Sequence, residues 1–184
     1  MSVREDSHDV PTCSVPGVVL MSRTIRSLLA GVAGAVAYLA AQEIDRRIVN
    51  PRSNDLLLLG GMVTSKEAVW KPLGLVMHLL AGASFGLIFD RVVAPRLRGP
   101  YWLRGVQMAQ FENATLWPLV LLMDRSHVAV KGGQLAPMNQ PVYFGQAVWR
   151  HLALGAVMGW LLQPEPDAAT ADVADTEKVV GIRA

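Results

Sequence analysis

The chain has 184 residues, of which 52% are hydrophobic and only 17% are charged, and its formal net charge is +2. This length fits one soluble domain or one membrane bundle, and the charged fraction is below the ~25% of an average soluble domain. The single cysteine, Cys13, excludes an intramolecular disulfide, and without a cluster of lysines and arginines the sequence predicts no nucleic-acid partner.

The N-terminal part combines a polar tail with a first apolar segment. Residues 1–22 mix charges and prolines without a period, which predicts a disordered tail, with Met21 as an alternative start of the protein. The uncharged run that follows, 27–41, is shorter than the roughly 20 residues of a spanning helix. The predicted helix therefore extends over 27–48. A signal peptide is the alternative, because two arginines precede the run.

Three further apolar segments follow, and the chain ends in an acidic tail. Spanning helices are predicted at about 70–90, 104–124 and 142–163, and a second disordered tail at 164–184. A soluble bundle would carry a polar stripe along each helix, and these segments have none. The sequence therefore predicts an all-α, four-helix transmembrane bundle.

The same pattern predicts where the protein lies in the cell. Four spans place both termini on one side, and the short connection between the second and third spans carries four arginines. Because positive residues favour the cytoplasmic side, we expect a multi-pass protein of the inner (plasma) membrane with both termini in the cytoplasm. The lipid bilayer is the first expected partner.

A repeat links the second and fourth segments. His78 is followed by Gly82 and Gly86 at steps of four residues, and His151 by Gly155 and Gly159 at the same steps. This predicts two related helical hairpins, in which Glu43 of the first corresponds to Glu112 of the second. Small residues four apart allow close helix packing. The predicted packing positions are Gly31, Gly34, Gly82, Gly86, Gly155 and Gly159.

Several polar side chains fall inside the apolar segments. A charge at the middle of a membrane costs about 2.5–3.5 kcal/mol on insertion scales, so Glu112 is expected to face the interior of the bundle within reach of Arg150 or His151. Hydrogen bonds from neighbouring amides would complete the cluster. The predicted intramembrane polar cluster consists of His78, Glu43, Glu112, Asn113, Gln146, Arg150 and His151.

The two intramembrane histidines allow three interpretations. They hydrogen-bond inside the bundle, they ligate a b-type haem between two helices, or they form a metal site with Glu43 and Glu112. The spacing lacks the Glu-x-x-His motif of di-iron bundles. No cofactor and no metal site are therefore predicted, with haem on His78 and His151 as the alternative.

The segment Glu112-Asn113…Trp117-Pro118, with Arg150-His151-x3-Gly155-x3-Gly159, is similar in layout to small four-helix bacterial membrane proteins of an uncharacterised family. The resemblance covers residues 23–163 and implies an architecture but no activity. No nucleotide-binding or hydrolase motif is present, so no catalytic residue is assigned.

The predicted function is that of a membrane protein whose polar interior serves packing or association with a partner. The first alternative is a proton or small-solute transporter or channel that uses Glu112, His78 and His151. Such a protein would favour a homo-oligomer, because this chain is short for a monomeric transporter. The second alternative is a haem-binding electron carrier.

Overall fold

The computed structural model describes residues 22–164, and the predicted tails fall almost wholly outside that range. Every regular element in this part of the chain is helical. The four long helices are α1 (Arg23–Ile48), α3 (Glu67–Ile88), α4 (Tyr101–Asp124) and α6 (Pro141–Leu161). Four short elements connect them: α2 (Asp55–Gly60), the π-helix η1 (Phe89–Val93), the 3-10 helix η2 (Ala94–Arg96) and α5 (Val128–Lys131).

The helix boundaries follow from local sequence signals. The Oγ of Ser22 accepts a hydrogen bond from the Ile25 amide at 3.3 Å and caps α1. The side chain of Asn54 accepts from two amides of α2 in the same way. Prolines stand at the start of α4 and α6, where the missing amide proton costs nothing. The four predicted segments are therefore helices with nearly the predicted bounds.

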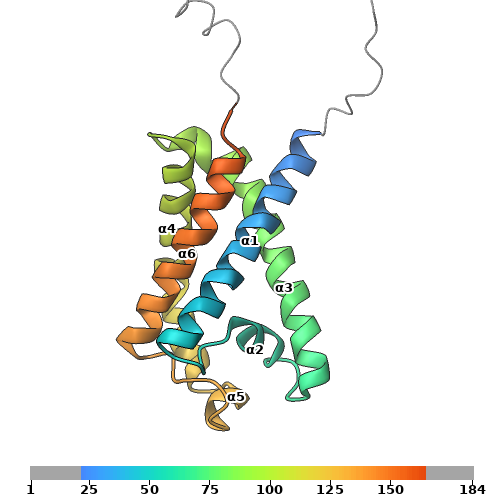
Figure 1. The fold of residues 1–184 in the computed structure, drawn as a ribbon, viewed down its shortest axis with the longest axis vertical. Helices are drawn as coiled ribbons and strands as arrows, with labels where there is room; N and C mark the ends of the chain where they lie inside the picture. Colours follow the sequence, from blue (N-terminus) through green and yellow to red (C-terminus); the bar gives the residue numbers. More distant parts are fainter. Residues whose placement is uncertain (1–21, 165–184) are drawn as a thin grey trace, which may run out of the picture.

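The long helices pack in the order α3, α1, α6, α4, so that α3 and α4 lie on the outside (Figure 1). The helix α1 begins and α6 ends at the same end of the bundle. Near the opposite end α1 and α3 diverge, and α2 occupies the space between them. The predicted hairpins are thus α1–α2–α3 and α4–α5–α6.

Glycines make the closest contacts within each hairpin. A methyl group added to Gly31 of α1 would collide with the backbone of Gly82 and Gly86 of α3. A methyl group added to Gly105 of α4 would collide with the backbone of Gly155 in α6. The glycines expected at helix contacts thus lie at close approaches between helices, and Gly34 adds a similar contact between α1 and α6. Gly60, Gly74 and Gly105, which were not among those expected, also lie at such approaches.

The outer surface of the bundle is apolar, and much of its interior is small or polar. Large hydrophobic side chains on all four long helices are exposed, whereas the buried set includes Ser27, Gln42, Asp45, Asn113 and Arg150. Within residues 22–164, two stretches are long and apolar enough to cross a membrane, Arg23–Ile48 and Glu67–Arg96. The other two predicted spans, in α4 and α6, do not meet this criterion, because polar residues lower their hydropathy.

Candidate functional site

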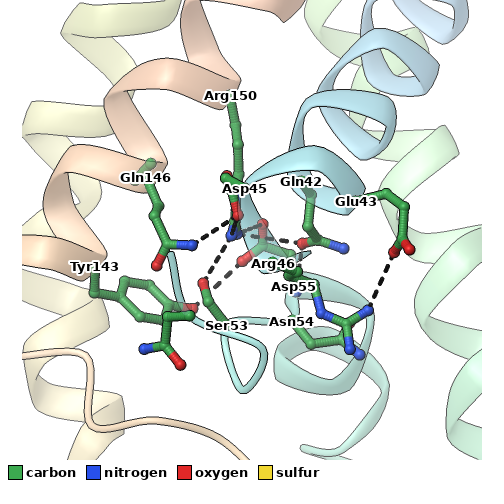
Figure 2. A network of polar contacts seen from close by, with 12 residues as sticks. Gln42, Glu43, Asp45, Arg46, Ser53, Asn54, Asp55, Tyr143, Gln146 and Arg150 are labelled. Atoms are coloured by element: carbon green, nitrogen blue, oxygen red, sulfur yellow. Dashed lines mark hydrogen bonds and ion pairs between the residues drawn. The ribbon is translucent and has the colours of Figure 1, made fainter. Parts of the chain in front are cut away.

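The largest polar cluster surrounds Arg150 of α6, whose side chain is 1% exposed (Figure 2). Its Nε and Nη2 donate to the two carboxylate oxygens of Asp45 at 2.7 and 2.6 Å. Its Nη1 donates to Asp55 at 2.9 Å and to Gln42 at 3.3 Å, and Nη2 also donates to Ser53 at 2.8 Å. All five N–H groups of the guanidinium are thus satisfied. We call Arg150 with these four partners the Arg150 network.

The Arg150 network joins three parts of the chain. Gln42 and Asp45 come from the end of α1, Ser53 and Asp55 from the loop and first turn of α2, and Arg150 from α6. From α6, Gln146 donates to Asp45 at 2.7 Å and the Tyr143 hydroxyl lies 3.4 Å from Asp55. A bidentate arginine–carboxylate pair fixes orientation as well as distance. The network therefore holds α2 against the ends of α1 and α6.

Of the two partners expected for Glu112, Arg150 is wrong and His151 is found. Glu112 instead approaches His151, with 3.0 Å between its Oε2 and the histidine Nε2. The reason is helical geometry: neighbouring residues on an α-helix point about 100° apart. Arg150 therefore faces α1, while His151 faces α4. Glu112 therefore faces the interior of the bundle, as expected, with His151 as its partner.

Sequence reasoning missed Asp45 and Asp55, the two carboxylates that hold Arg150. The available signal was the spacing of Tyr38, Gln42 and Asp45, which places all three on one face of a helix. Asp55 gave no comparable signal, because it follows Asn54 in what reads as an ordinary helix start. Asp55 reaches Arg150 because the chain folds back after α1 and places α2 between α1 and α3 (Figure 1).

A second polar group lines a cavity of about 240 Å³ between α3 and α4, which we call the side pocket. Its lining residues come from α1, α2, α3, α4 and α6, and most of its surface is apolar. Ala81 of α3 and Leu116 of α4 line it and remain exposed, so its mouth lies between these two helices. The polar residues that line it include Tyr38, Asp55, His78, Glu112, Asn113 and His151.

The tyrosine ring of Tyr38 contacts both imidazoles of the side pocket. Its centroid lies 5.0 Å from that of His78 and 5.1 Å from that of His151. Each histidine is also held by a backbone carbonyl of a long helix. His78 Nε2 lies 3.2 Å from the Ala35 oxygen, and His151 Nδ1 lies 2.7 Å from the Ala147 oxygen. The rings are therefore fixed in orientation.

The helix contacts revise the predicted correspondence between the hairpins. Tyr38 lies seven residues after Gly31, and Glu112 lies seven residues after Gly105. Since Gly31 and Gly105 make matching contacts, Tyr38 and not Glu43 occupies the position equivalent to Glu112. Glu43 lies outside the polar interior: its side chain is 51% exposed and pairs with Arg46 and Arg47 of its own helix.

The side pocket does not fit the haem or the metal interpretation. A haem plane between His78 and His151 would have to displace the Tyr38 ring, which contacts both. Within residues 22–164 no group of three or more histidine, cysteine or acidic side chains is placed to hold a metal ion. Hydrogen bonding and ring packing account for the positions of both histidines.

Asn113 is the least satisfied of the predicted site residues. It is 6% exposed, and its side-chain nitrogen has no hydrogen-bond partner among the described residues. The same holds for the side-chain oxygen of Gln146, whose nitrogen donates to Asp45. A buried donor without a partner costs about 1–3 kcal/mol. Asn113 is also one of the residues that line the side pocket.

Comparison with known proteins adds no assignment: no family model, no curated protein and no solved structure matches the chain.

Proposed function

We propose that this protein is a four-span membrane protein in which the Arg150 network holds the helices together and the side pocket binds a small amphiphile from the bilayer. The apolar outer surface supports the membrane location. Exposed leucines and valines on all four long helices would face lipid, while arginine and carboxylates are buried in pairs. A protein in water gains free energy by burying large apolar side chains, and here many of them remain outside.

The position of the side pocket is the observation that carries the binding function. Its mouth lies between α3 and α4, near the middle of both helices and on the same apolar surface. A molecule dissolved in lipid would reach it sideways, without crossing a headgroup layer. Sites that combine an apolar wall with a few fixed polar groups are typical of small-molecule binding. The interior therefore serves packing at the Arg150 network and binding at the side pocket.

Transport is the second candidate, because Glu112, His78 and His151 all line this one cavity. Ionisable groups inside a membrane bundle mark proton and solute pathways in many transporters. In proteoliposomes, a transporter that uses these groups would lose flux on Glu112→Gln. Unchanged flux in this variant would contradict transport through these groups and leave ligand binding as the proposed function.

We propose that both termini lie in the cytoplasm, because four arginines (Arg91, Arg96, Arg98 and Arg104) lie in and beside the short connection between α3 and α4. The chain has a single cysteine, so a Cys13→Ser background allows site-specific labelling. In intact cells, a membrane-impermeant thiol reagent should label Thr64→Cys and not Arg98→Cys. The opposite pattern would reverse the orientation. Labelling of both sites would contradict a sealed, membrane-spanning arrangement.

Binding is tested by native mass spectrometry of the full chain with four probes: dodecanol, dodecanoic acid, dodecylamine and a decyl-substituted benzoquinone. Leu116→Trp places an indole at the mouth of the side pocket, whereas Leu122→Trp changes α4 outside it. The two leucines are 43% and 62% exposed, so neither change overfills the interior. We expect the wild type and Leu122→Trp to retain at least one probe that Leu116→Trp loses. The proposal would be overturned if the wild type retained none of the four probes, or if Leu116→Trp and Leu122→Trp retained them equally.

A further inference from the structure

We propose that the ligand of the side pocket is a lipid-soluble quinone: an uncharged, planar ring that carries carbonyl oxygens and an apolar tail. This inference rests on the proposed binding function and names the chemical class of its ligand. The argument uses the charges, the rings and the free hydrogen-bonding capacity of the pocket.

The charges of the side pocket favour an uncharged ligand. Among the described residues neither a lysine nor an arginine lines it, so these residues offer no free cation to a carboxylate or phosphate head. Its two carboxylates already have partners, since Glu112 pairs with His151 and Asp55 with Arg150. A cationic head would therefore gain little. Burying a charge without a partner is costly, so the ligand must be neutral where it enters the pocket.

The hydrogen-bond partners of His151 indicate which of its ring nitrogens carries a proton. The Ala147 carbonyl can only accept, so the Nδ1 of His151 that faces it at 2.7 Å carries a proton. The opposite nitrogen, Nε2, lies 3.0 Å from Glu112, so a proton between them is shared within the pair and leaves it neutral overall. A pair in this state adds no net charge to the wall of the pocket.

The rings of the side pocket favour a flat head. Six lining residues carry a ring: Tyr38, His78, Phe85, Trp117, Tyr143 and His151. They come from α1, α3, α4 and α6, and their faces and edges offer the offset or edge-on contacts that planar groups prefer. A volume of about 240 Å³ equals roughly eight water molecules of the liquid, which suits a single substituted ring. An alkyl or isoprenoid tail would then leave through the mouth between α3 and α4.

Asn113 supplies the specificity for a carbonyl oxygen. Its amide nitrogen lacks an acceptor within the described chain, and its residue lines the pocket, so a rotation of the buried amide would bring the nitrogen to a ligand oxygen. A quinone oxygen accepts and cannot donate, so it matches this amide. A simple alcohol could also accept, but it would not use the surrounding rings.

The experiment extends the four-probe measurement to a titration of the decyl-substituted benzoquinone. Binding should quench the fluorescence of Trp117, and a Trp117→Phe variant identifies the signal of that residue. We expect the benzoquinone to bind at least tenfold more tightly than dodecanol, and Asn113→Leu to weaken the benzoquinone about tenfold while changing dodecanol little.

Two results would overturn the assignment in distinguishable ways. If dodecanol, dodecanoic acid or dodecylamine binds at the Leu116-sensitive site and the benzoquinone does not, the ligand class is wrong and the binding function stands. If none of the four is retained, the binding function itself fails. Because Asn113→Leu changes a buried position, its thermal unfolding is measured first. If that variant does not fold, Asn113→Ala takes its place, and unchanged benzoquinone affinity in the variant that folds would contradict the proposal.

Discussion

Replacing Arg150 by leucine should lower the free energy of unfolding by about 3–5 kcal/mol, the typical cost of removing one partner from a buried ion pair. The side chain is 1% exposed and holds both Asp45 and Asp55. Without the guanidinium, the hydrogen-bond partners left to the two carboxylates among the described side chains are the Gln146 amide and the Tyr143 hydroxyl. The measurement is chemical unfolding of the purified protein in detergent or bilayer.

Two controls separate this effect from a general loss of positive charge. Arg98→Leu removes an exposed arginine and should change the unfolding free energy by less than about 0.5 kcal/mol. The triple variant Arg150→Leu, Asp45→Asn, Asp55→Asn removes the uncompensated charges and should recover a large part of the loss. If Arg150→Leu is as mild as Arg98→Leu, or if the three changes add without recovery, the network does not hold the helices.

Substituting alanine for Gly155 is expected to destabilise the bundle by about 3 kcal/mol, at the upper end of the range for overpacking. An added methyl group would come within 2.5 Å of the Gly105 carbonyl oxygen and 2.7 Å of the Val106 Cα. These are backbone atoms of α4, so the contact can be relieved only by moving the whole helix. Thermal unfolding of the purified variant measures the effect.

The same helix offers a matched control. Gly145 also lies in α6, but an added methyl group would meet no atom within 4 Å. Gly145→Ala should therefore leave stability unchanged, or raise it by up to about 1 kcal/mol through the higher helix propensity of alanine. Equal behaviour of the two variants would show that the α4–α6 approach does not depend on glycine.

The positions of the long helices could be predicted from the sequence because their signals are local. Apolar runs of sufficient length, prolines at helix starts and glycines at four-residue steps depend only on neighbours along the chain. The contacts of Gly82 and Gly86 with α1, and of Gly155 with α4, follow from that spacing. The partner of Arg150 could not be predicted in this way.

The sequence by itself thus determined the helices, the glycine faces and the presence of buried polar groups that need partners. Only the tertiary structure decided which groups meet. The return of α2 between α1 and α3 brings Asp55 to Arg150, and the 100° step from Arg150 to His151 sends these neighbours to different partners. Tyr38 enters the side pocket because the helix crossing at Gly31 fixes its height on α1. These contacts join residues far apart in the chain, and periodicity along one helix does not specify its rotation against the next.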